Sequence, residues 1–177
     1  MSAQDVEIVA GYRPGALGRL VEMHGAYYAR EWGFGAFFEA KVAAESAAYF
    51  QRYDTRTDCA WFVFRDSKVI GSMIIDGGEA GAAEAGGHLR WFILDDGCRG
   101  LGLGNDLMRR ALEFCDARAF SRIYLTTFAG LDAARALYER HGFCLTGEKQ
   151  DQTWGRDVTE QRFERPGLAS SGAPRNM

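Results

Sequence analysis

Residues 88–119, with the sequence HLRWFILDDGCRGLGLGNDLMRRALEFCDARA, decide the fold because they join a strand, a glycine-rich loop and a helix. The apolar run over 88–96 predicts a strand that is buried on both faces. Three glycines then alternate with leucines, and apolar side chains at helical spacing predict a helix over 105–119. Such a unit forms an anion site, because the first N–H groups of a helix have no intrahelical partner and glycines let an anion approach them.

Further strands and helices surround this unit. Alternating or β-branched runs predict strands, and apolar side chains at spacings of three and four predict helices. The expected strands are 6–12, 59–66, 69–76, 122–128, 143–150 and 157–165, and the expected helices are 16–32, 36–53 and 131–142. We expect a small-residue loop over 77–87 and a disordered tail over 166–177.

The order of these elements predicts an α+β fold. The early strands form an antiparallel meander, whereas the strands 88–96 and 122–128 are joined by a helix, which makes them parallel. A chain of 177 residues is most simply one domain. We therefore expect a single domain over 1–165, a mixed αβα-type sandwich with a mostly antiparallel sheet and one parallel pair.

The composition limits the classes of partner. Hydrophobic residues make up 47% of the chain and charged residues 25%, which is ordinary for a soluble globular protein, and a net charge of -3 gives no general affinity for nucleic acid. No apolar run reaches the roughly 18 residues of a membrane span, and the N-terminus lacks the basic and apolar regions of a signal peptide. We expect a cytoplasmic protein that binds neither nucleic acid nor membrane.

The four cysteines predict reduced, buried thiols and no metal site. They form no CxxC pair and have no zinc-ligand spacing with the three histidines. Cys98 is the exception, because it precedes Arg99 and the glycine loop. A cation and a helix N-terminus together are expected to lower the pKa of its thiol.

Three alternatives compete for the glycine loop: the pyrophosphate of a nucleotide, that of a coenzyme, or a tight turn with no ligand. The dinucleotide fingerprint requires a glycine where this chain has Asn105, and an acidic residue that 122–128 lacks. The nucleoside triphosphate loop requires a Gly-Lys-Ser/Thr sequence, which does not occur. A turn without a ligand stays open, although one glycine would suffice for it.

Two segments resemble the motifs of the Gcn5-related N-acetyltransferases, the GNAT superfamily. RGLGLG at 99–104 fits the Arg/Gln-x-x-Gly-x-Gly/Ala signature, and AARALYERHGF at 133–143 is similar to the second motif, a helix with a tyrosine four residues before Gly-Phe. The resemblance covers roughly residues 6–165. The chain also resembles, more narrowly, the acetyltransferase halves of bacterial fusion regulators with a preceding MarR-type DNA-binding domain. Because 177 residues leave no room for that domain, we expect a stand-alone version.

The resemblance implies a site for acetyl-CoA between the strands 88–96 and 122–128, which splay apart in this family. The pantetheine would pair with the backbone of Phe92 and Leu94, and an N–H near Leu94 would stabilise the oxyanion. Thr127, with Thr126, would replace an asparagine that members often have where this chain has Leu131. The pyrophosphate would lie on Arg99, Gly100, Leu101, Gly102, Leu103, Gly104 and Asn105.

The resemblance also assigns the chemistry. Tyr138 matches the general acid that protonates the leaving thiolate, and His88 matches a residue that works through water as the base. The implied function is an N-acetyltransferase that joins acetyl-CoA and a primary amine of a small molecule or protein in a ternary complex. A non-catalytic acyl-CoA sensor or regulatory module is the alternative. A homodimer is expected by analogy alone.

The acceptor pocket is expected beside the first two helices. His24 is expected to be packed or exposed rather than catalytic, and Glu31 and Glu39 are candidates to bind an ammonium group. An apolar or aromatic pocket is indicated by the aromatic side chains around the bend between these helices, which are Tyr27, Tyr28, Trp32, Phe34, Phe37 and Phe38.

Overall fold

A computed structural model describes residues 6–78 and 86–168 of the chain. Seven strands form one sheet in the order β1-β2-β3-β4-β5-β7-β6. All neighbouring strands are antiparallel except β4 and β5, which confirms the predicted mixed sheet. The strands are β1 (Val6–Ala10), β2 (Cys59–Arg65), β3 (Lys68–Asp76), β4 (Gly86–Leu94), β5 (Arg122–Phe128), β6 (Cys144–Asp151) and β7 (Val158–Pro166).

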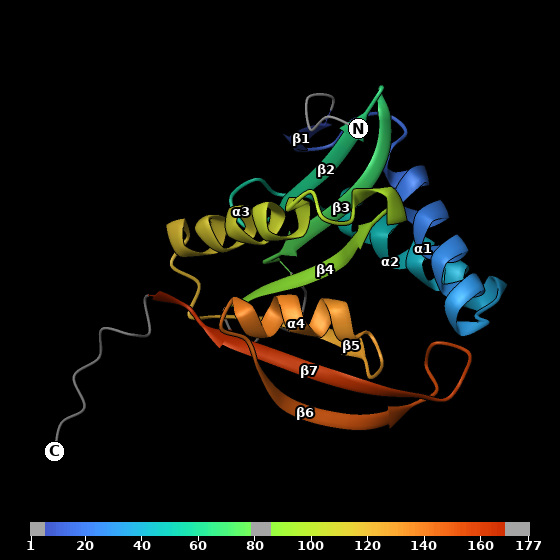
Figure 1. Cartoon of the computed structure of the whole chain (residues 1–177). Coiled ribbons are helices and arrows are strands. Elements are labelled where there is room, and N and C mark those ends of the chain that lie inside the picture. The colour runs from blue at the N-terminus through green and yellow to red at the C-terminus, as the bar shows by residue number, and fades with distance from the viewer. Residues whose placement is uncertain (1–5, 79–85, 169–177) are drawn as a thin grey trace, which may run out of the picture.

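Helices cover both faces of the sheet (Figure 1). They are α1 (Ala16–Trp32), α2 (Ala36–Gln51), α3 (Leu103–Ala117) and α4 (Asp132–Arg140), with a short 3₁₀ helix at Asp96–Cys98 that the sequence patterns did not predict. One buried apolar cluster joins α3 and α4 to the sheet, and a second joins α1 and α2 to it. The αβα-type sandwich is therefore confirmed.

A β-bulge in β4 lies just beyond the point where the parallel strands part. Ser72 pairs with Ile93 and Ile74 with Arg90, so β4 has one residue more than β3 over this span. Trp91 lies at the bulge with a φ of 46°, and the Ser72 hydroxyl donates a 2.7 Å hydrogen bond to its carbonyl. β4 pairs with β5 only from Gly86 to His88. Beyond that point the strands part, as the family resemblance implied.

Several predicted boundaries shift. Gly86 and Gly87, expected in a loop, belong to β4 because they pair with β5. The last strand includes Pro166, and the N–H of Gly167 donates to the Ser121 carbonyl at 2.9 Å, so the predicted tail begins with ordered residues. The rest of that tail, 169–177, and residues 79–85 of the predicted loop lie outside the described residues.

Neither a membrane-spanning helix nor a metal-ligand cluster is found among the described residues. No helix among them is both long and apolar enough to span a membrane. No group of three histidine, cysteine, aspartate or glutamate side chains there is placed to hold a metal ion.

Candidate active site

Two cavities meet where β4 and β5 part. A groove of about 790 Å³ runs along the end of β4 and over the glycine loop, and a smaller cavity of about 130 Å³ lies on the α1 and α2 side. The groove is the larger of the two, and the small cavity has about a sixth of its volume. Four side chains line both and so mark their junction: Tyr28, Phe92, Thr127 and Tyr138.

The glycine loop leaves the N-terminus of α3 open to the groove. Gly100 and Gly102 have φ values of 76° and 72°, a conformation that costs other residues about 1–2 kcal/mol. No side chain caps α3, and Asp106 donates the first i→i−4 bond, to Gly102. The N–H groups of the first helical turn therefore have no intrahelical acceptor. The Arg99 side chain is 84% exposed beside them, paired with Asp96 at 3.0 Å. This end of the groove suits an anion.

The groove brings together nine of the ten residues predicted to bind the coenzyme. They are Phe92, Leu94, Arg99, Gly100, Gly102, Leu103, Gly104, Asn105 and Thr127. Leu101 does not line it and is 38% exposed, because the turn between Gly100 and Gly102 directs its side chain into solvent. Leu131 lines the groove at the position where the family often has asparagine.

Tyr138 is fixed at the junction by the end of α4. The N–H of Phe143 donates to the Tyr138 carbonyl at 3.1 Å and the N–H of Gly142 to Glu139 at 3.1 Å, which is the Schellman pattern of helix termination. The phenol ring is 5% exposed and packs against Phe143 and Phe163, each with its centroid 6.1 Å away. Burial raises the pKa of the phenol well above its ordinary value, so the group remains a proton donor.

The small cavity combines aromatic walls with polar groups. Tyr28 and Phe38, predicted from the sequence, line it, together with Trp91, Phe128 and Trp154. Tyr27 lines the groove instead, and Phe37 is 62% exposed. The polar side chains in the cavity wall are His24, Glu45, His88, Arg90, Thr126, Thr127, Tyr138 and Glu160.

The two predicted carboxylates are not in this cavity. Glu31 is paired with Arg30 at 2.6 Å and, like Glu39, is exposed and absent from the cavity wall. The carboxylates that line the cavity are Glu45 of α2 and Glu160 of β7. The sequence offers no local signal for this pair, because β7 approaches the cavity only after the sheet has formed.

Both predicted histidines line the cavity, in different environments. His88 stacks on Tyr124, with 4.5 Å between the ring centroids. His24 is 5% exposed and its Nδ1 lies 2.8 Å from the Leu20 carbonyl. His24 was expected to be packed or exposed, and the structure places it packed, with an edge at the cavity.

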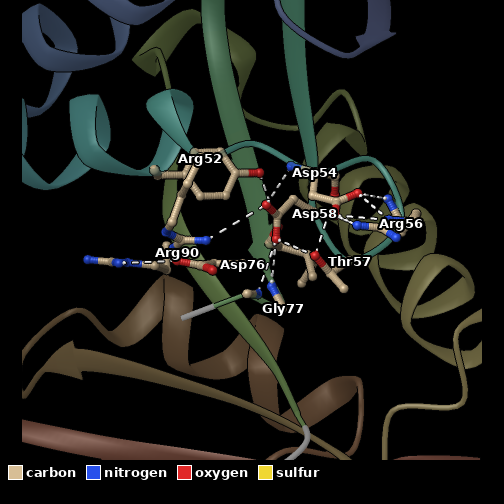
Figure 2. Close-up of polar contacts among 11 residues, drawn as sticks. Arg52, Asp54, Arg56, Thr57, Asp58, Asp76, Gly77 and Arg90 are labelled. Carbon is tan, nitrogen blue, oxygen red and sulfur yellow. Dashed lines mark hydrogen bonds and ion pairs between the residues drawn. The ribbon is translucent and has the colours of Figure 1, made fainter. Parts of the chain in front are cut away.

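A buried ionic network holds Arg90 in the cavity wall. The Asp76 carboxylate is fully buried, accepts from Arg52 at 2.5 Å and lies 3.4 Å from Arg90 (Figure 2). Asp58 is 1% exposed and accepts from the N–H groups of Gly77 and Gly78, at 3.0 and 3.2 Å. The other side of the Arg90 guanidinium contacts Glu45 at 2.6 Å. The network therefore holds the Arg90 guanidinium in position in the cavity wall.

The environment of Cys98 and the pKa of its thiol differ from the prediction. Its side chain is buried, and its sulfur lies 3.8 Å from the Ile70 carbonyl. Burial raises the pKa of the thiol, whereas the sequence position predicted a lowered one. The prediction was wrong because the 3₁₀ helix turns the side chain into the core, away from Arg99.

Comparison with known proteins agrees with this geometry. Residues 18–143 match the family model described as "Acetyltransferase (GNAT) family". The chain is 31% identical over 110 residues to an N-acetylaspartate synthetase of Danio rerio and 35% over 89 residues to that of Xenopus tropicalis, covering 62% and 50% of this chain. It spans about a third of the length of these relatives, 37% and 32%.

Solved structures show the same fold. A ribosomal-protein-alanine N-acetyltransferase from Brucella melitensis superposes with a TM-score of 0.71 at 16% identity, covering 90% of this chain and 99% of that one. An acetyltransferase from Streptococcus agalactiae gives 0.65 at 25% identity, covering 92% and 99%. The strand–loop–helix unit and the splayed sheet define an acetyltransferase fold. This chain belongs to the GNAT family of acetyltransferases.

Proposed function

We propose that the protein transfers an acetyl group from acetyl-CoA directly to a primary amine, with both substrates bound at once. The observation that supports this most is the meeting of the long groove and the small cavity at Tyr138. A coenzyme in the groove and an amine in the cavity would bring their reactive ends to one point. Holding two reactants together in this way supplies a large part of the rate enhancement.

The coenzyme would bind through the loop and through β4. The pyrophosphate would accept from the free N–H groups at the start of α3 and from Arg99, while Thr127 and Leu131 line the opposite wall. The pantetheine would add to the edge of β4 that faces β5, which β5 leaves unpaired at Phe92 and Leu94. Leu101 would take part only through its backbone, because its side chain does not line the groove.

Acetyl transfer then requires the protein to stabilise an oxyanion, to protonate the leaving thiolate and to remove a proton from the amine. The nitrogen of the neutral amine attacks the thioester carbonyl, forming a C–N bond, and the C–S bond breaks as the thiolate leaves. A backbone N–H near Leu94 would stabilise the oxyanion, and Tyr138 would protonate the thiolate. His88, at the cavity wall, would remove the proton that the amine loses, through water.

The volume of the small cavity favours a small acceptor amine, or a larger acceptor of which only the narrow amine end enters the cavity. Its volume of about 130 Å³ is comparable with the roughly 150 Å³ site that holds benzene in an engineered protein. The aromatic walls favour an amine with an apolar body. The name of the relatives, N-acetylaspartate synthetase, makes aspartate one acceptor to test.

A non-catalytic acyl-CoA sensor is the second candidate. Leu131 supports it, because this position of the groove has no side chain that could hydrogen-bond the coenzyme. The similarity of the sequence to the acetyltransferase halves of MarR-type fusion regulators points the same way. A sensor would bind acetyl-CoA and release no thiol with any amine.

Replacing Arg99 with alanine should weaken CoA binding by about 10- to 100-fold, because a charge-assisted hydrogen bond contributes roughly 1.5–3 kcal/mol. Titration calorimetry with CoA measures the effect. Arg109→Ala is the matched control, since Arg109 is an arginine of α3 that does not line the groove. Equal loss in both variants would indicate a nonspecific effect of charge and would remove the role assigned to Arg99.

A further inference from the structure

We infer that Nε2 of His24 accepts a hydrogen bond from the amine of the acceptor and so orients the nitrogen toward the thioester. This inference rests on the proposed function. It adds a substrate-contacting residue that neither the family motifs nor the sequence patterns indicated. It also implies that the cavity receives the amine as the neutral free base.

The tautomer of His24 follows from the hydrogen bond that its ring makes with Leu20. Nδ1 lies 2.8 Å from the Leu20 carbonyl, one helical turn back along α1. A carbonyl oxygen only accepts, so Nδ1 bears the hydrogen, and in the neutral ring Nε2 is then a bare acceptor. Burial lowers the pKa of this imidazole to about 4, which keeps the ring neutral at physiological pH.

We assign the acceptor nitrogen to the cavity side of the ring, because His24 lines the cavity and Nδ1 faces the Leu20 carbonyl. His24 is 5% exposed and contributes to the cavity wall, and no hydrogen-bond partner for Nε2 exists among residues 6–78 and 86–168. The ring stacks on Tyr28, which itself reaches the junction, with 6.3 Å between centroids. An unpaired polar atom in the wall of a cavity is a hydrogen-bonding site for a ligand.

The other basic groups of the cavity are already engaged. Glu45 contacts Arg90 at 2.6 Å and Lys41 at 2.7 Å, and Glu160 contacts Lys149 at 3.3 Å and the Trp154 indole at 3.3 Å. A carboxylate held by cations is a poor partner for an incoming amine.

His24 orients the amine and does not store its proton. An imidazole with so low a pKa is too weak a base to hold a proton from an alkylammonium group, whose pKa is about 10. The charged and titratable groups that share the cavity with His24 are Tyr28, Glu45, His88, Arg90, Tyr138 and Glu160. Among these, His88 keeps the role of removing the proton through water.

Two substitutions of His24 distinguish a hydrogen bond to the acceptor amine from a role in packing alone. In His24→Asn the amide nitrogen replaces Nδ1 and can donate to Leu20, but nothing replaces Nε2. In His24→Gln the longer side chain returns an amide oxygen near the position of Nε2. We expect His24→Asn to lower kcat/KM for the best amine of a small-amine panel by about 10-fold or more, and His24→Gln to restore most of it. The KM for acetyl-CoA should stay the same in both.

Equal kcat/KM in His24→Asn and the wild type would overturn the inference, as would an equal loss in His24→Asn and His24→Gln. If His24→Asn does not fold, the comparison of His24→Gln with the wild type decides, and a rate near that of the wild type supports the inference. If the wild type transfers acetyl to no amine, the proposed function fails and the following measurement still tests His24.

Nitrogen NMR of the histidine-labelled, CoA-bound wild type reads the tautomer directly. The chain has only three histidines, so the His24 signals are identified by their absence in a His24 variant. We expect a protonated Nδ1 and a bare Nε2 from pH 8 to pH 5. A proton on Nε2, or titration of this ring near pH 6.5, would overturn the inference whether or not the protein is an active enzyme.

Discussion

Replacing Tyr138 with phenylalanine is expected to lower kcat for acetyl transfer by about 10²- to 10⁴-fold, the usual contribution of a positioned general acid. Tyr138 lines both the groove and the cavity where they meet. Within the described residues, its phenol has no hydrogen bond that perturbs its pKa. The aromatic ring, which supplies the packing against Phe143 and Phe163, is kept. Affinity for acetyl-CoA and the melting temperature should therefore change little.

The matched control is Tyr12→Phe, which removes the same atom from a tyrosine that is 55% exposed and lines neither cavity. Initial rates at saturating acetyl-CoA, with calorimetric binding of CoA to each variant, separate turnover from affinity. If Tyr138→Phe and Tyr12→Phe are equally active, Tyr138 is a packing residue and the assigned acid is wrong.

Replacing Asp76 with asparagine is expected to destabilise the fold by about 3–5 kcal/mol, the usual cost of breaking a buried ion pair from one side. Asp76 is fully buried and contacts both Arg52 and Arg90 (Figure 2). Without its charge, both guanidinium groups lose their contact with a fully buried carboxylate. Arg52 then has Asp58 at 3.8 Å, and Arg90 has the half-buried Glu45 at 2.6 Å. The melting temperature should fall by on the order of 10 °C, and turnover should fall at temperatures where the variant is folded, because Arg90 is no longer held in the cavity wall.

Asp54→Asn is the control for this change. Asp54 is an acidic residue of the same region, but it pairs with Arg56, whose side chain is 86% exposed, and such surface pairs contribute little to stability. Thermal and denaturant unfolding of the two variants should differ clearly. Similar melting temperatures would show that the Asp76 network does not stabilise the fold and does not anchor Arg90.

Local signals predicted the elements well. The helix expected over 16–32 and the strand expected over 122–128 have those bounds in the structure. In both segments the spacing of apolar residues and the flanking helix- or strand-breaking residues indicate the same bounds. No contact with a distant part of the chain is needed to predict them. The glycine loop likewise lies at a helix N-terminus on the groove, because Gly100 and Gly102 adopt the conformation that glycine allows most easily.

Features that depend on distant partners were not predictable. The bulge at Trp91 depends on Ser72, a residue of the neighbouring strand that is 19 positions away. The cavity carboxylates come from α2 and β7, which meet only in the folded sheet, so Glu31 and Glu39 were chosen from helix position alone. Cys98 was assigned a lowered pKa from its neighbours in sequence, whereas burial decides its environment.

We propose above all that the groove and the cavity bring acetyl-CoA and an amine together for direct transfer. The most direct test mixes the wild-type protein with acetyl-CoA and a panel of small amines that includes aspartate, and follows free thiol and N-acetylated product together. We predict thiol release that requires an amine and matches the acetylated product mole for mole. Binding of acetyl-CoA with no amine-dependent thiol release across the panel would contradict the claim and favour an acyl-CoA sensor.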